Sequence, residues 1–428
     1  MSKLNVLDFG GNHCGGLSTI RKVLGGAWIF CLSALFLSSC TVKTPPHKAV
    51  TFMVYMAADN SLSEFALADI DEMERAHFNN SEANVIVQAD QAVYAENPYC
   101  RRWEIVADSL YDDQVSSPLI DELGEIDSGD WHSLAAFYNW CVDNYPAERY
   151  VLSIWSHGND WYSYATNPNK FCVDSQSNSF ISITEGELEL AFRAFDEYPD
   201  LVILDACHMQ SIEVLSEISP WCNYISGSTD LIPDSGYPYD EIITAVCRAL
   251  NYDYSAIPDI YVNSYKPGGS QNPTGMLNQA VCASLIETEV FNDEILNSVA
   301  EFVVYCLDHP EVFSDLMSAR AGCFEYNDLE IDVDLLEFCW KLTDLTNDPE
   351  LAELAAKLNE ELITANNFYN YPAAYAGNLL ITFPEISDSE TWMNLRNDFY
   401  KLNFNQLTNW GELINKIVVP ADRELVLH

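Results

Sequence analysis

The chain has 428 residues, 48% of them apolar and 12% aromatic, which is enough for a sizeable core in one large domain or two ordinary ones. Its 65 acidic residues outnumber its 20 basic ones and give a formal net charge of −45. This excess of acid argues against a nucleic-acid partner, because phosphates bind a basic surface. It is typical of a solvated surface that keeps a protein soluble, and attraction of basic peptides or calcium is the alternative.

The N-terminal segment carries the pattern of an export signal. Arg21 and Lys22 precede an apolar run over residues 23–37, which leads into Leu37-Ser38-Ser39-Cys40. A basic start, a short apolar stretch and small residues describe a secretory signal and not a membrane span.

The end of this segment resembles the lipobox of bacterial lipoproteins. The resemblance implies that residues 1–39 are removed and that Cys40 becomes the lipidated first residue. The protein would then be exported and anchored by lipid to a bacterial membrane, at the outer membrane or cell surface. The alternative is an ordinary signal peptide whose cysteine is incidental.

Short apolar runs and helical patterns alternate from residue 51 to residue 228. Strands are predicted over residues 51–57, 84–89, 103–107, 150–155, 201–204 and 224–228. Helices are predicted over residues 62–73, 131–142 and 211–218, and from Thr184, where Glu187 gives a capping-box spacing. Near-continuous apolar strands that alternate with helices indicate an α/β fold with a mainly parallel sheet, flanked by helices.

The pattern changes after about residue 240. Long helical patterns dominate to residue 368, and a last strand is predicted over residues 378–383. We therefore divide the mature chain near residue 250, into a sheet domain over residues 40–250 and a helix-rich C-terminal part over residues 251–428 that packs on it.

Reactive side chains follow two of the predicted strands. The strand at 150–155 leads into Ser156-His157-Gly158, and the strand at 201–204 leads into Asp205-Ala206-Cys207. Ligand sites of open α/β sheets lie beyond the carboxyl ends of the strands, so neighbouring strands would bring His157 and Cys207 together. A thiol is mostly protonated at neutral pH and needs a base such as imidazole. The pattern predicts a cysteine nucleophile with a histidine base.

Gly158 has a use in the same chemistry. Without a side chain its backbone can approach a substrate closely, and its N–H group, with that of Cys207, could stabilise an oxyanion. A lone cysteine after a strand is more often structural, and the prediction depends on both halves of the pair.

Four segments resemble the clostripain-like cysteine peptidases, relatives of caspases, gingipains and legumains. They are TFMVYMAADNSL at 51–62, ELGEIDSGD at 122–130, YVLSIWSHGNDW at 150–161 and LVILDACHMQSIEVLSEI at 201–218. The resemblance covers residues 50–240 well and the later half in scattered pieces. It implies a caspase-like catalytic domain over residues 40–250, and peptide-bond hydrolysis through a thioester with His157 as base and Cys207 as nucleophile.

The resemblance also implies a preference for Arg or Lys before the scissile bond, because an acidic pocket pairs with a basic side chain. The family position two residues before the nucleophile falls on Asp205, for which a loop-capping role is the alternative. Asp230 and Asp234 are candidates for the pocket floor, or ordinary turn acids. The family usually has a Glu-rich stretch here, where this chain has Thr229-Asp230.

Lys170 is a candidate processing site. It lies 13 residues after His157 in a polar stretch with proline and asparagine, and it is the only Lys or Arg between Arg149 and Arg193. A peptidase that prefers basic residues could cut its own chain after Lys170, in a region where family relatives are often processed. The alternative is a simple surface lysine.

The sequence requires no cofactor and predicts no metal site, since its cysteines form no CxxC pair. Calcium is a candidate ion by family resemblance, without a ligand set in the sequence. The expected partners are protein or peptide substrates, and the membrane through the lipid anchor. Two alternatives remain, namely an inactive caspase-fold protein and an adhesion-type binding lipoprotein.

Overall fold

The structure is a computed structural model. It describes residues 47–96, 98–107, 114–162, 170–249, 252–326, 331–372 and 377–419. The predicted signal segment, residues 1–39, and the predicted lipidation site Cys40 lie outside the described residues. Within the described ranges, every helix is too short or too polar to span a bilayer.

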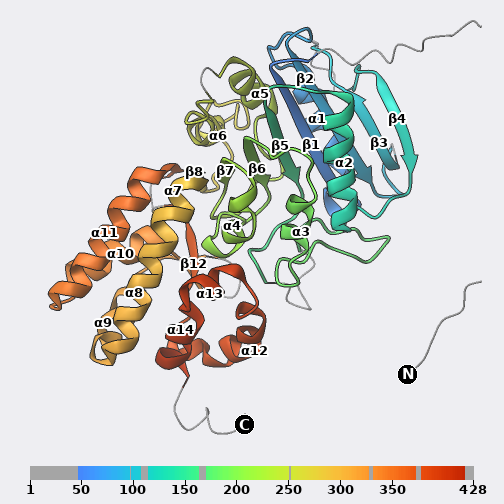
Figure 1. Ribbon diagram of the computed structural model, residues 1–428. Helices are drawn as coiled ribbons and strands as arrows, with labels where there is room; N and C mark the ends of the chain where they lie inside the picture. The colour runs from blue at the N-terminus through green and yellow to red at the C-terminus, as the bar shows by residue number, and fades with distance from the viewer. Residues whose placement is uncertain are drawn as a thin grey trace, which may run out of the picture. The chain divides into compact units, whose positions relative to one another are not determined.

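Within the described residues, nine strands form the main sheet, in the order β11-β8-β7-β6-β5-β1-β2-β3-β4 (Figure 1). The central strands run parallel: β7 (Tyr224–Gly227), β6 (Leu201–Asp205), β5 (Tyr150–Trp155), β1 (Val50–Ala58) and β2 (Ala83–Gln91). Antiparallel strands close both edges: β8 (Val281–Glu287) and β11 (Asn366–Tyr371) at one, β3 (Tyr99–Glu104) and β4 (Leu119–Gly124) at the other. The α/β fold predicted from the apolar runs is confirmed, and the parallel pairing lies at the centre of a mixed sheet with antiparallel edges.

Helices cover both faces of this sheet. Successive side chains of a strand point to opposite faces, so a central strand contributes to two separate cores. In β1, Met53, Tyr55 and Ala57 face one core, to which α2 (Trp131–Asn144), α3 (Glu187–Arg193) and α4 (Ile212–Ile218) contribute. Phe52, Val54 and Met56 face a second core, made with α1 (Ala66–Glu74), α5 (Tyr239–Arg248) and α6 (Ile257–Tyr265). Burial on both faces explains why the central strands are apolar throughout.

The later part of the chain is rich in helices: α7 (Thr288–Val290), α8 (Leu296–Asp308), α9 (Phe313–Arg320), α10 (Leu335–Leu345), α11 (Pro349–Ala365), α12 (Ser389–Phe399), α13 (Asn403–Thr408) and α14 (Trp410–Val418). A small antiparallel sheet, in the order β12-β10-β9, joins Leu380–Thr382, Asp332–Asp334 and Glu325–Tyr326. The division near residue 250 stays a prediction, and strands from both sides of it share the main sheet.

Two details of the predicted elements are wrong. The helix expected from Thr184 begins at Glu187, with Gly186 as its N-cap and no side-chain capping hydrogen bond; the Glu187 carboxylate instead accepts the Ser182 N–H at 2.8 Å. The helical pattern expected up to residue 368 also contains the strands β8 and β11. The strand β8 is buried, and a buried strand of this length cannot be distinguished from buried helix by periodicity alone, whereas β11 is mostly exposed or half-buried.

Candidate active site

The loops that follow β5 and β6 meet at one edge of the sheet. These two strands are parallel neighbours with Trp155 opposite Asp205, and the Ser156 N–H donates to the Asp205 carbonyl at 3.1 Å. His157 and Cys207 each lie two residues beyond that pair, and both line a single cavity of about 500 Å³. The predicted meeting of the two loops is confirmed.

The remaining walls of the cavity come from three other loops. Leu62 follows β1, residues 231–236 follow β7, and residues 271–279 precede β8. The cavity therefore lies beyond the carboxyl ends of the parallel strands, where sites of this fold class form.

In this arrangement the Cys207 thiol and the His157 imidazole have other partners. The Ile232 N–H donates to the Cys207 sulfur at 3.3 Å, and burial raises the pKa of this thiol to about 11. The His157 Nε2 atom lies 2.9 Å from the Ser61 hydroxyl, and burial lowers the pKa of His157, partly opposed by Asp234. At neutral pH the resting site thus holds an uncharged thiol and an uncharged imidazole.

Gly158 allows the two loops to pack closely. A Cβ atom built on it would lie 2.6 Å from the Cys207 carbonyl oxygen and 2.9 Å from the Ala206 Cβ atom. Neither contact is sterically allowed, so only glycine permits this approach.

Gly158→Ala is expected to push the loop after β5 away from Cys207 and to lower both stability and the peptide hydrolysis that the sequence predicts. Overpacking of this kind costs about 1–3 kcal/mol of unfolding free energy. Urea unfolding and peptide hydrolysis measure the two effects. The control is Gly322→Ala, where the nearest contact is 3.2 Å to the flexible Lys341 side chain. Equal stability and activity of both variants would contradict the packing argument.

The floor of the cavity is acidic. Asp205 lines it with only 4% of its surface exposed, and its carboxylate accepts the Tyr239 O–H at 2.9 Å and the Tyr237 N–H at 3.4 Å. Burial raises the pKa of Asp205 to about 7, although both hydrogen bonds lower it. A Cβ atom on Gly236 would lie 3.0 Å from the Asp205 Oδ2 atom, so the loop after β7 passes directly over this carboxylate.

Two further buried acids beside the floor were not predicted. The Trp155 indole N–H donates to the Asp69 carboxylate at 2.6 Å, and Gln271 donates to the Glu72 carboxylate at 2.7 Å. Burial raises the pKa of Glu72 to about 8, and for Asp69 burial, Glu72 and Asp205 all raise it. The position of Asp69 among the residues of the buried face of α1 could have indicated a buried carboxylate.

The other predicted acids lie in different places. Asp234 lines the same cavity as His157 and Cys207, and its charge opposes the fall in the His157 pKa. Asp230 is not among the cavity-lining residues, and its carboxylate accepts the Leu231 N–H at 2.7 Å within its own turn. The structure therefore places Asp234 at the cavity and Asp230 in the turn.

Lys170 begins the described segment that follows residues 163–169, which lie outside the described residues. Its ammonium group lies 4.1 Å from the centre of the Phe180 ring. Phe171 is buried, and its carbonyl accepts the Ile181 N–H at 3.0 Å. The peptide bond between Lys170 and Phe171 is thus anchored on its C-terminal side.

Comparison with known proteins places this geometry in context. The sequence model of the clostripain family, Peptidase_C11, matches residues 54–416. Clostripain of Hathewaya histolytica is 25% identical over 228 residues, which cover 47% of this chain and 42% of clostripain, so the match spans less than half of that relative.

Two solved structures share the fold. One is a secreted C11 cysteine protease from Bacteroides thetaiotaomicron in complex with an irreversible peptide inhibitor, and the other is an inactive zymogen C11 protease from Parabacteroides distasonis. Each has a TM-score of 0.63 and 20% identity, and covers 85% of this chain and 99% of its own. At this identity the likeness shows the fold, and it agrees with the sheet flanked by helices.

Proposed function

The chain belongs to the clostripain family, and from this premise we propose that it is a cysteine endopeptidase with Cys207 as nucleophile and His157 as base. The observation that carries the proposal is that both residues line one cavity from the ends of neighbouring strands. The cavity of about 500 Å³ beyond the carboxyl ends of the strands can receive part of a peptide substrate.

The chemistry follows from the two groups. His157 takes the thiol proton, the Cys207 sulfur attacks the peptide carbonyl, and the backbone N–H groups of Gly158 and Cys207 stabilise the resulting oxyanion. The intermediate collapses to a thioester as His157 gives its proton to the leaving amine. Water then attacks the thioester with His157 again as base, and the free thiol returns. For the first step, Ile232 and Ser61 must give up their contacts with the sulfur and the imidazole.

The acidic floor supports a preference for Arg or Lys before the scissile bond. Asp205 lines the cavity with Asp234, and Asp69 lies beside Asp205 beneath Gly236. A cationic side chain that enters this floor would neutralise buried carboxylates that otherwise repel one another.

The test compares two peptides that differ only in one internal residue, lysine in the first and glutamine in the second. We expect mass spectrometry to find cleavage after lysine alone, and no cleavage by Cys207→Ala. Cleavage after glutamine would contradict the specificity. If neither peptide nor an arginine analogue is cut, the inactive or adhesion-type alternatives are favoured over a peptidase.

We also propose lipid anchoring at Cys40, which rests on the apolar run that ends in Leu37-Ser38-Ser39-Cys40. Cys40 is the residue predicted to carry the acyl chains that anchor the exported protein. Cys40→Ser is therefore expected to move the protein from the membrane fraction to the soluble fraction. Fractionation of cells followed by immunoblotting measures the change. Equal membrane association of both proteins would dismiss the lipid anchor.

Self-processing after Lys170 is a further part of the proposal. Active protein is expected to show a new N-terminus at Phe171, and both Cys207→Ala and Lys170→Gln should remove it. N-terminal sequencing of the purified protein measures this. Because the Phe171 backbone is hydrogen-bonded to Ile181, cleavage requires local release of the backbone at Lys170 and Phe171. A fully active protein that remains a single chain would contradict self-processing.

A further inference from the structure

His208, the residue directly after Cys207, is held in an uncommon backbone conformation. Its φ angle is 59°, in the left-handed region, and only 4% of its surface is exposed. A residue with a Cβ atom is rarely found there, although histidine tolerates it better than most. Such conformations persist only where surrounding contacts impose them, and they are common at functional sites. The contacts of His208 must therefore stabilise this turn of the chain.

The His208 imidazole contacts the loop that follows β7, residues 228–236. Its Nδ1 atom lies 3.0 Å from the Thr229 carbonyl oxygen. A carbonyl oxygen only accepts hydrogen bonds, so Nδ1 carries a proton and donates. Thr229 is fully buried, and its hydroxyl lies 3.0 Å from the Cys282 sulfur in β8. The imidazole thus grips the loop at a residue that is itself fixed against the sheet.

Two backbone hydrogen bonds run beside this side-chain contact. The His208 N–H donates to the Asp230 carbonyl at 3.3 Å, and the Gln210 N–H donates to the Ser228 carbonyl at 3.1 Å. The first three residues of the 228–236 loop are therefore attached to the chain that directly follows the nucleophile.

The later part of the 228–236 loop lies against the thiol. Residues 231–236 line the cavity, and Asp234 is one of them. The Ile232 N–H donates to the Cys207 sulfur at 3.3 Å, and the Ile232 carbonyl lies 3.8 Å from the same sulfur. A shift of this loop would therefore move one acid of the cavity and uncover the nucleophile at the same time.

His208 is placed to act on this loop and not on a substrate. Among the described residues that line the cavity, His157 is present and His208 is not. The Nδ1 atom of His208 is also engaged by the Thr229 carbonyl. His208 is thus a positioning residue and not a second catalytic base.

We propose that His208 positions the 228–236 loop against Cys207 through the hydrogen bond from its Nδ1 atom to the Thr229 carbonyl. The inference rests on the proposed peptidase function, because it assigns the loop a task in substrate binding. The bond keeps Ile232 at the sulfur and Asp234 at the cavity. When it is lost, a buried carbonyl loses a donor, and the loop gains by moving toward water.

Hydrolysis of the lysine peptide by His208→Ala, His208→Asn and His208→Gln tests the proposal. Asparagine tolerates the left-handed conformation and can donate from close to the place of Nδ1, whereas the longer glutamine carries its donor near the place of Nε2. We expect kcat/KM to fall at least about tenfold in His208→Ala and His208→Gln, and to stay within about threefold of the parent in His208→Asn. If His208 only filled space, glutamine would be the better substitute, because it is closer to histidine in volume.

The rate at which iodoacetamide alkylates Cys207 is a second readout, which does not require peptide hydrolysis. Release of the 228–236 loop should uncover the sulfur. We therefore expect faster alkylation in His208→Ala and His208→Gln than in the parent and in His208→Asn, measured by mass spectrometry of the full chain. If the parent cuts no peptide, the proposed peptidase function fails, and the alkylation rates still decide whether His208 holds the loop.

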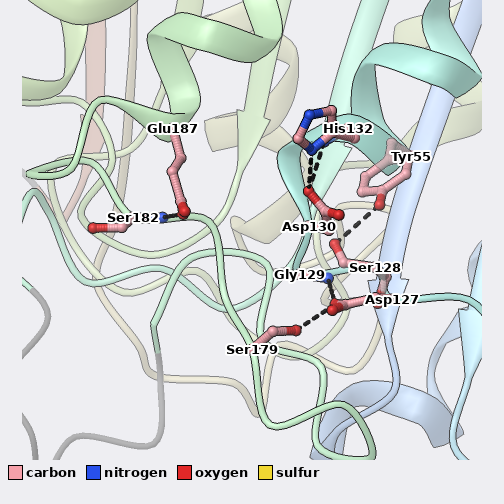
Figure 2. A network of polar contacts seen from close by, with 9 residues as sticks. All are labelled: Tyr55, Asp127, Ser128, Gly129, Asp130, His132, Ser179, Ser182 and Glu187. Carbon is pink, nitrogen blue, oxygen red and sulfur yellow. Dashed lines mark hydrogen bonds and ion pairs between the residues drawn. The ribbon is translucent and has the colours of Figure 1, made fainter.

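The matched control is His132→Ala. His132 is an exposed histidine at the start of α2, and its Nδ1 atom lies 2.7 Å from the Asp130 carboxylate (Figure 2). This variant should equal the parent in both readouts.

Unchanged hydrolysis and alkylation in His208→Ala would overturn the proposal. Recovery by glutamine and not by asparagine would overturn the role of the Nδ1 hydrogen bond. Should His208→Ala fail to fold, the comparison of the asparagine and glutamine variants decides the question alone.

Discussion

Cys207→Ala is expected to lower kcat/KM for peptide hydrolysis by about 10⁴-fold or more, and His157→Ala by several orders of magnitude. Without the thiol no thioester forms, and without the imidazole the thiol, whose pKa burial raises to about 11, stays protonated at neutral pH. The two losses should not add, because the residues act as one unit in the same step. Steady-state kinetics of both single variants and of the double variant measure this.

Unfolding curves of these variants should remain close to that of the parent protein, which separates lost chemistry from lost fold. Cys323→Ala is the matched control, since this half-buried cysteine lies in the helix-rich part and outside the cavity. It should keep full activity. A double variant far less active than either single variant would show that Cys207 and His157 act in different steps.

Asp205→Asn is expected to lower kcat/KM about 30-fold or more for peptides with Arg or Lys before the scissile bond. Removing one partner of a buried charge pair costs about 2–5 kcal/mol. Asparagine keeps the shape and can still accept the Tyr239 hydroxyl, so the floor of the cavity should stay intact. Peptides with glutamine at the same position should be affected much less.

Asp205→Asn should also change how kcat/KM for basic peptides depends on pH. Because burial raises the pKa of Asp205 to about 7, its carboxyl is neutral below that pH and pairs poorly with a cation. In the parent protein, kcat/KM for basic peptides should therefore rise with pH through about 7 more steeply than for glutamine peptides. Asp230→Asn, which alters an acid of the turn, should keep this difference. Equal losses on basic and glutamine peptides in Asp205→Asn would contradict the specificity argument.

The meeting of His157 and Cys207 at one edge of the sheet could be predicted from sequence because it depends on local patterns. The apolar runs that became β5 and β6 end at fixed points, and parallel neighbours align their carboxyl ends. His157 and Cys207 therefore meet as a consequence of strand order alone. Gly158 was predicted to let a substrate approach the backbone, and the structure shows a use that was not predicted, since the Cys207 loop packs directly against it.

Other parts of the site depend on contacts between residues distant in sequence. Asp69 lies beside the cavity floor only because α1 packs next to Trp155, 86 residues away. The Ser61 contact with His157 bridges 96 residues, and no local pattern marks it. The carboxylates of Asp59, Glu125 and Asp174 lie close together but come from three separate segments, so their proximity could not be inferred from spacing.

The helix-rich part was predicted least well. The strand β8 is a run of buried residues that periodicity cannot separate from helix, and β11 directly follows the long helix α11. Both strands owe their conformation to pairing at the edge of the main sheet. Tertiary pairing outweighs local propensity at such positions.

The claim that Cys207 is the nucleophile is tested most directly by alkylating a peptide-hydrolysing preparation with iodoacetamide. Mass spectrometry then shows which cysteines have been modified. Burial raises the pKa of every described cysteine, but Cys207 alone among them lines the cavity. Cys282 also has a pKa of about 11 and is fully buried. We predict that activity falls in proportion to alkylation of Cys207. Full activity in protein whose Cys207 is completely alkylated would contradict its role as the nucleophile.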